Sequence, residues 1–171
     1  FYESVNFAVT KNIPVLFVCE NNSYSVYSPL SVRQPLNRKI YQMVRGMGME
    51  SLWEDGNDVR KTHTAALKAI NTIKNTGKPF FIELETYRWR EHCGPNYDND
   101  IGYRSEDEFK SWKKKDPIKA FEKTLLMEMK TSKAVLKSIK SEIRNEVRAA
   151  FRFAKKSPFP SASEAFESMY K

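Results

Sequence analysis

The stretch VLFVCENNSY, residues 15–24, decides the fold class of this chain. Its five consecutive apolar residues are typical of a strand that helices cover on both faces, because a half-exposed strand alternates polar and apolar residues instead. The run ends in Asn21 and Asn22, which we expect at the carboxyl edge of a parallel sheet, where α/β folds bind ligands. An amide oxygen there is a neutral, hard ligand for a divalent cation. A simple turn is the alternative, since Asn side chains readily bond their own backbone.

The order of the remaining segments indicates an α/β fold. Apolar strand segments alternate with helical segments, a pattern that predicts a parallel sheet with right-handed crossovers. Phe1 opens directly into a helical pattern without a capping residue, so we expect the chain to continue upstream. In the second long helix, Gly77 is placed to end the helix, and Val59, Ala66, Ile70 and Ile73 share one face. The predicted strands are residues 15–19, 52–54 and 80–86, and the predicted helices between them are 36–47 and 58–76.

The composition changes after Thr86. Residues 87–104 are rich in Gly, Pro, Asn and Asp, and a loop of this length inside a compact domain is usually functional or disordered. Beyond the loop the chain is helical, with a capping-box pair at Ser105 and Glu108 and a helix start at Asp116. We therefore divide the chain into an α/β domain, residues 1–104, and a helical extension, residues 105–171. The last long helix starts after Ser132 and ends at residues 157–160, with these residues expected to face inward: Leu136, Ile139, Ile143, Val147 and Phe151.

Charge and cysteine content restrict the class of protein. The net charge of +8 comes from 29 basic residues interleaved with 21 acidic ones, and no basic cluster alternates with stacking aromatics. We therefore expect no nucleic-acid partner, although a basic helical nucleic-acid binder remains an alternative. The two cysteines provide no disulfide framework, which favours an intracellular, cytoplasmic protein. No apolar run is long enough to span a membrane.

Three motifs in sequence order identify a resemblance. They are ENNSY at 20–24, TYRWREH at 86–92 and GYR at 102–104. In this order and spacing they resemble the alpha subunit of thiamine-diphosphate-dependent 2-oxo acid and acetoin dehydrogenases, the pyruvate dehydrogenase alpha type, over residues 1–160. The resemblance implies a partial thiamine-diphosphate-binding fold with a helical C-terminal extension. In that family a Gly-Asp-Gly motif precedes the paired asparagines, so we expect this fragment alone to be inactive.

The same resemblance implies roles for four residues. The Asn22 side chain and the Tyr24 main-chain carbonyl match ligands of Mg²⁺, which holds the diphosphate of the cofactor together with the Asp of the upstream motif. His92 matches a cofactor-contacting, catalytic histidine that protonates the thiamine-bound intermediate and assists acyl transfer. Arg88 matches an arginine that orders the catalytic loop, and its guanidinium is also suited to an oxyanion. From the residues alone, a surface loop histidine without a role is the favoured interpretation of His92, and only the resemblance reverses it.

The resemblance also implies partners and a reaction. The assembly would be an α2β2 heterotetramer with a separate beta subunit, which cleaves a carbon–carbon bond next to a carbonyl in a small-molecule substrate, a 2-oxo acid or acetoin. It would pass the acyl group to a lipoyl-bearing acyltransferase, in the cytoplasm or, in a eukaryote, the mitochondrial matrix. Arg90 and Glu91 depart from mammalian members, and Cys93 replaces a regulatory serine, so phosphorylation is not expected there. A non-catalytic structural subunit or gene fragment that keeps only partner-binding surfaces is the other alternative.

Overall fold

The computed structural model describes residues 1–167, and the chain forms two compact units, Phe1–Phe121 and Glu122–Lys171. The first unit contains the parallel sheet, and the second consists mainly of one long helix. In chain order the elements are α1 (Tyr2–Thr10), β1 (Leu16–Asn21), β2 (Tyr24–Ser25), β3 (Ser28–Pro29), the 3₁₀ helix η1 (Leu30–Val32), α2 (Ile40–Gly46), β4 (Glu50–Asp55), α3 (Val59–Thr76), β5 (Phe80–Glu85), α4 (Glu106–Lys113), α5 (Pro117–Met127), α6 (Lys133–Lys156) and the 3₁₀ helix η2 (Ala162–Phe166).

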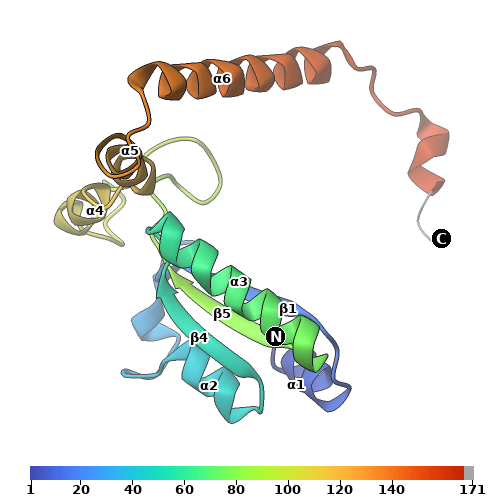
Figure 1. The fold of residues 1–171 in the computed structure, drawn as a ribbon. Coiled ribbons are helices and arrows are strands. Elements are labelled where there is room, and N and C mark those ends of the chain that lie inside the picture. Colours follow the sequence, from blue (N-terminus) through green and yellow to red (C-terminus); the bar gives the residue numbers. More distant parts are fainter. Residues whose placement is uncertain (168–171) are drawn as a thin grey trace. The chain divides into compact units, whose positions relative to one another are not determined.

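A three-stranded parallel sheet forms the centre of the first unit (Figure 1). β5 lies between β1 and β4, and both neighbours run parallel to it. The register places Asn21 of β1 and Asp55 of β4 opposite Glu85 of β5. The α/β prediction is therefore confirmed, and the carboxyl ends of all three strands meet at one edge. The short antiparallel pair of β2 and β3 was not predicted from the sequence.

Helices cover the two faces of β5. Phe80 and Ile82 pack against α3, whereas Phe81 packs against α1 and α2 on the opposite face (Figure 1). The strand covered on both faces is thus β5. β1 lies at the edge of the sheet and Val18 is 53% exposed, so the expectation of full cover for the 15–19 run is wrong within this chain.

α3 has the ends that the sequence predicts. The Asp58 side chain accepts hydrogen bonds from the amides of the second and third helical residues, and Gly77 ends the helix with a left-handed φ of 67°. The buried face differs by one position from the prediction, because Ala65 and Ala69 are buried while Ile70 is largely exposed. Two alanines present little side chain, so the helix can lie close to the aromatic residue Phe80.

The second unit contains α6, which begins after its N-cap Ser132 as predicted. Four of the five apolar residues expected to face inward are exposed among the described residues of this unit, contrary to expectation, whereas Leu136 is half-buried. Ile139, Ile143, Val147 and Phe151 are 44–65% exposed, because no other described element of the unit forms a layer against them. The basic residues of the same helix are exposed as well, as expected for a solvated face. None of the helices within residues 1–167 is both long and apolar enough to cross a membrane.

We expect the loop after β4 to require glycine. The Gly56 amide donates to the Glu85 carbonyl oxygen at 2.8 Å, and an added Cβ would lie 2.9 Å from that oxygen. Gly56→Ala should therefore lower the free energy of unfolding by about 1–3 kcal/mol, measured by urea denaturation of the intact protein. Gly46→Ala is the matched control, because nothing lies within 4 Å of its added Cβ and alanine favours a helix. Equal destabilisation by both changes would contradict this account of Gly56.

Candidate functional site

The residues after β1 form two successive Asx turns, here called the Asn turn (residues 21–24). Asn21 Oδ1 accepts from the Ser23 amide at 3.1 Å, and Asn22 Oδ1 accepts from the Tyr24 amide at 3.0 Å. Ser23 takes the left-handed φ of 66° that this arrangement requires. An amide oxygen has two lone pairs, so the bond to Tyr24 orients the Asn22 oxygen and leaves one lone pair for a ligand. The turn and the cation-ligand alternatives are therefore compatible, and the ligand role stays a prediction.

A buried carboxylate holds the first residue of the Asn turn. Asn21 Nδ2 donates to Glu83 Oε1 at 2.7 Å, and Glu83 Oε2 accepts from the Tyr41 amide of α2 at 2.9 Å. Glu83 is only 4% exposed. Burial, together with the charges of Glu83 and Glu20, raises the pKa of the Cys19 thiol to about 11. Both polar atoms of the Asn21 side chain are thus hydrogen-bonded within the protein, with Nδ2 bound to Glu83 and Oδ1 to the Ser23 amide. Asn22 is therefore the better candidate ligand for a cation.

Polar contacts also join the ends of the three strands. The Thr86 amide donates to the Asn21 carbonyl at 3.0 Å, and Thr86 Oγ1 donates to Asn57 Oδ1 at 2.8 Å. Asn57 Nδ2 in turn donates to the Lys115 carbonyl, which follows α4, at 3.2 Å. α4 therefore belongs to the first compact unit, whose limit at Phe121 differs from the expected boundary after residue 104.

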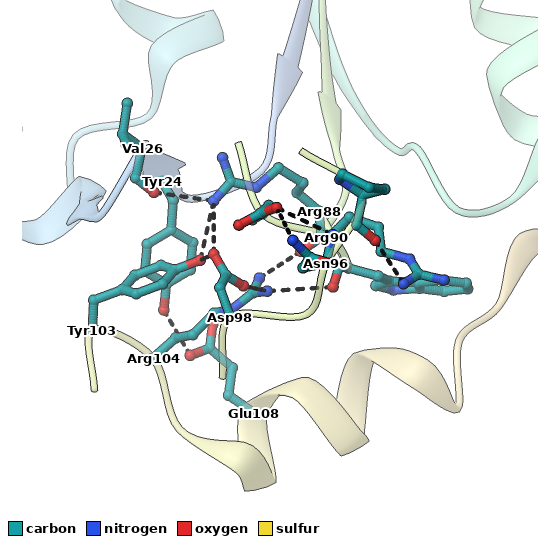
Figure 2. A network of polar contacts seen from close by, with 12 residues as sticks. Tyr24, Val26, Arg88, Arg90, Asn96, Asp98, Tyr103, Arg104 and Glu108 are labelled. Carbon is teal, nitrogen blue, oxygen red and sulfur yellow. Dashed lines mark hydrogen bonds and ion pairs between the residues drawn. The ribbon is translucent and has the colours of Figure 1, made fainter. Parts of the chain in front are cut away.

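Asp98 is the residue at which the polar contacts of the 87–104 loop converge (Figure 2). It is 1% exposed and forms an ion pair with the buried Arg104, while the Tyr103 hydroxyl donates to it at 2.7 Å. The sequence analysis assigned no role to Asp98. Burial raises the pKa of the Asp98 carboxyl, but the Tyr103 hydrogen bond and the Arg104 charge outweigh it, and the pKa lies below its usual value.

Arg88 joins this loop to the strand hairpin that follows the Asn turn. Its Nη2 donates to the Val26 carbonyl and to the Tyr103 hydroxyl, both at 3.0 Å, and lies 3.9 Å from Asp98 Oδ2 (Figure 2). Arg88 thus connects three separate parts of the chain, and the loop-ordering role that the resemblance implies for it stays a prediction.

Tyr24 connects the Asn turn to α4. Its hydroxyl donates to Glu108 Oε2 at 2.7 Å, and its ring contacts Tyr103 edge-on at 5.3 Å. Burial and the hydrogen bond to Glu108 raise the pKa of Tyr24, so the hydroxyl remains a donor at neutral pH. The predicted capping box is therefore only half formed, because Ser105 Oγ accepts from the Glu108 amide while the Glu108 side chain binds Tyr24.

His92 lies at an exposed tip of the loop, away from these polar contacts. The tip is closed by Glu91, whose amide donates to the Asn96 carbonyl at 3.0 Å and whose Oε1 accepts from Asn96 Nδ2 at 2.9 Å. His92 and Cys93 are both exposed, and the described part of the chain contains no hydrogen bond or ion pair of His92. The catalytic role of His92 stays a prediction. His63 is exposed on α3.

The donor set at the Asn turn suits a cation that arrives with its own anionic ligand. Residues 1–167 contain no group of three or more His, Cys, Asp or Glu side chains that could hold a metal. The amide oxygen of Asn22 and the main-chain carbonyl of Tyr24 are neutral, so they fit Mg²⁺ whose charge a diphosphate already balances.

Comparison with known proteins identifies the family. The family model described as "Dehydrogenase E1 component" matches residues 1–163. This chain belongs to the dehydrogenase E1 component family.

Individual E1 relatives align over almost all of the chain. A pyruvate dehydrogenase E1 component subunit alpha of Rickettsia felis is 29% identical over 169 residues, covering 99% of this chain and 51% of the relative. The chloroplastic subunit alpha-3 of Oryza sativa is 32% identical over 170 residues, covering 99% of this chain and 39% of the relative. The pyruvate dehydrogenase E1 component subunit alpha of Porphyra purpurea is 31% identical over 164 residues, covering 96% of this chain and 46% of the relative. The chain thus spans about half the length of the curated relatives it matches.

The sequence analysis of this E1 chain missed several residues of the site. Glu83 had a recognisable signal, because it is a single charged residue inside the otherwise apolar run 80–84. Asp98 had none, and Arg104 was noted only as part of the GYR motif, since the pairing of the two depends on the path of an irregular loop. Glu108 was recognised, but for the wrong contact, because a capping box and a tertiary hydrogen bond need the same residue type.

We expect the Asp98 ion pair to keep the 87–104 loop ordered. Asp98→Asn leaves the buried Arg104 without its counter-charge, a change that costs about 3–5 kcal/mol in buried pairs, so cleavage of the loop in limited proteolysis should become faster. Asp100→Asn, at an exposed position of the same loop, is the control and should leave cleavage unchanged.

The lowered pKa of Asp98 determines the direction in which the stability of the loop changes with pH. A carboxyl with a lowered folded-state pKa stabilises the fold above its unfolded pKa, about 3.9, and that contribution is lost as pH falls through the folded pKa. Loop cleavage by an acid-tolerant protease should therefore stay constant from about pH 8 to pH 5 and rise only below about pH 4. A rise near pH 6 would show that Asp98 does not control the loop.

Proposed function

We propose that this E1 chain is part of the alpha subunit of a thiamine-diphosphate-dependent dehydrogenase that acts on a 2-oxo acid. The observation that carries the proposal is the Asn turn at the carboxyl end of β1, where a hydrogen bond orients the Asn22 amide and Arg88 of the 87–104 loop binds the hairpin that follows. Ligands of α/β folds bind outside this edge of the sheet. The names of the E1 relatives, all pyruvate dehydrogenase alpha subunits, support an oxidoreductase that acts on an oxo group. Acetoin is an alternative substrate of the same reaction type.

The proposed cofactor site uses neutral oxygen atoms. The Asn22 side chain and the Tyr24 carbonyl would hold Mg²⁺, and Mg²⁺ would hold the diphosphate. When bound, the thiamine ring supplies the carbanion chemistry, and the protein contributes binding and orientation. The hydrogen bond from Tyr24 to Glu108 supports the metal role, because it restrains the residue whose carbonyl is the proposed ligand.

The loop would supply the remaining groups on this chain. Arg88 holds the loop against the carbonyl of Val26, and His92, exposed at the tip, would move a proton and guide the acyl group toward a lipoyl arm. A beta subunit and a lipoyl-bearing acyltransferase are the proposed partners, in an α2β2 assembly. The proposed compartment is the cytoplasm, or the mitochondrial matrix in a eukaryote.

Asn22→Ala should weaken Mg²⁺ and thiamine diphosphate binding together, because alanine offers no oxygen and Mg²⁺ tolerates little departure from octahedral geometry. Calorimetric titration of the full-length protein with its beta subunit should show both affinities reduced by about 10- to 100-fold or more. Asn71→Ala on the exposed surface of α3 is the matched control. Unchanged affinity in Asn22→Ala would contradict the metal role of this residue, and wild-type protein that binds no cofactor would contradict the proposed function.

His92→Gln should lower the turnover of 2-oxo acid by about 10²- to 10⁴-fold while cofactor affinity changes little, because a general acid–base group acts on the reaction more than on binding. The measurement is steady-state turnover of the assembled complex with pyruvate and lipoylated acceptor. His63→Gln, which changes an exposed histidine on α3, should retain full turnover. Equal turnover in the two variants would show that His92 is an ordinary surface residue.

A further inference from the structure

The buried Glu83 carboxylate accepts hydrogen bonds from two partly buried donors. Its two carboxylate oxygens accept from Asn21 Nδ2 at 2.7 Å and from the Tyr41 amide at 2.9 Å. Its 4% exposure leaves almost no access for water to replace either bond. A carboxylate offers acceptors on both oxygens, whereas an amide offers one acceptor and one donor. The site therefore discriminates between Glu and Gln even though the two side chains have nearly the same shape.

The contact to Asn21 fixes the direction of its side-chain amide. With Nδ2 directed at Glu83, Oδ1 points the other way and accepts from the Ser23 amide at 3.1 Å. If the amide were reversed, an N–H group would face the Ser23 N–H group, and the first Asx turn would be lost. The second Asx turn, at Asn22, follows directly on the first and depends on the backbone path that the first one sets.

Glu83 is thus connected to the proposed cation ligands without reaching them. The connection runs from the carboxylate to Asn21, from Asn21 to Ser23, and along the backbone to the Asn22 and Tyr24 oxygens. Groups that orient metal ligands in this way affect metal affinity by about 10- to 100-fold in other proteins. Glu83 belongs to the central strand β5, whose backbone is hydrogen-bonded on both sides. The position of its carboxylate, and with it the position of the Asn21 side chain, is therefore restrained by the sheet.

We propose that Glu83 is a positioning residue that sets the geometry of the cation-binding Asn turn by fixing the amide orientation of Asn21. This role rests on the proposed function, because it assigns Mg²⁺ with thiamine diphosphate as the ligand of the turn. Glu83 touches neither the cation nor the cofactor, and it acts only through Asn21.

The test reverses the hydrogen bond in a double variant that keeps the net charge of the pair, whereas each single variant changes that charge. Glu83→Gln removes one acceptor, and Asn21→Asp places two carboxylates against each other. The double variant restores every bond, because the Gln amide group donates to the Asp carboxylate, its oxygen accepts from the Tyr41 amide, and the Asp carboxylate still accepts from Ser23. The measurements are calorimetric affinity for Mn²⁺ with thiamine diphosphate, and urea denaturation, both on the full-length protein assembled with its beta subunit.

Each single variant should lose about 10- to 100-fold in Mn²⁺ affinity, and the double variant should recover most of it. Two controls separate other causes. Ser51→Ala removes a buried hydroxyl that donates to the Tyr41 carbonyl at 2.6 Å, so it should lower stability without lowering Mn²⁺ affinity. Glu20→Gln removes an exposed negative charge beside Asn21 and should leave the affinity unchanged.

The outcomes are distinguishable. Wild-type protein that binds no Mn²⁺ with thiamine diphosphate would overturn the proposed function and this role with it. Wild-type binding together with unaltered affinity in Glu83→Gln would overturn the positioning role alone. So would a double variant as weak as the single ones, or a Ser51→Ala variant that loses as much affinity, since Glu83 would then serve only the stability of the fold.

Discussion

The parallel register of β5 with its two neighbours is the constraint on which the site depends. It aligns the last residues of three strands, so that Asn21 and Asp55 both lie opposite Glu85. A slip by one residue would turn each side chain of β5 to the other face of the sheet. Glu83 would then point toward α3, and Ile82 would face the amide of Asn21. The division of β5 into a face with Phe80 and Ile82 and a face with Phe81 and Glu83 thus fixes both the core and the support of the Asn turn.

A second constraint is the burial of charge in the loop that follows β5. The pair of Asp98 and Arg104 contributes little net stability, because the free energy lost by removing both charges from water nearly cancels the free energy gained from their attraction. Its effect is on conformation, since any loop path that separates the two residues leaves a buried charge without a partner. The same pair positions Tyr103 against Arg88, and Arg88 reaches the hairpin after the Asn turn. The loop is therefore ordered around polar groups rather than an apolar core.

The features that the sequence predicts are local ones. Asp58, Ser132 and Gly77 act within one turn of their own helix, and the mainly apolar runs mark β1 and β5 without reference to other segments. Partners far along the chain were not predictable in this way. The hydrogen bond between Tyr24 and Glu108 joins residues 84 positions apart in the sequence. Helical periodicity, in turn, indicates which face of a helix is apolar but not which element packs against that face. For that reason the apolar face of α6 was expected to be buried, although it is exposed in its own unit.

The strand order has a consequence for folding during synthesis. Within the described chain, β1 and β4 each pair only with β5, the last of the three strands to leave the ribosome. Neither strand can pair with β5 until residue 85 has emerged. Parallel pairing between strands far apart in the sequence is slow. The intervening chain must lose conformational entropy to bring the strands together before the contacts that offset this loss can form. Unpaired strand edges are prone to aggregation, so the nascent chain is exposed to this risk until its middle strand arrives.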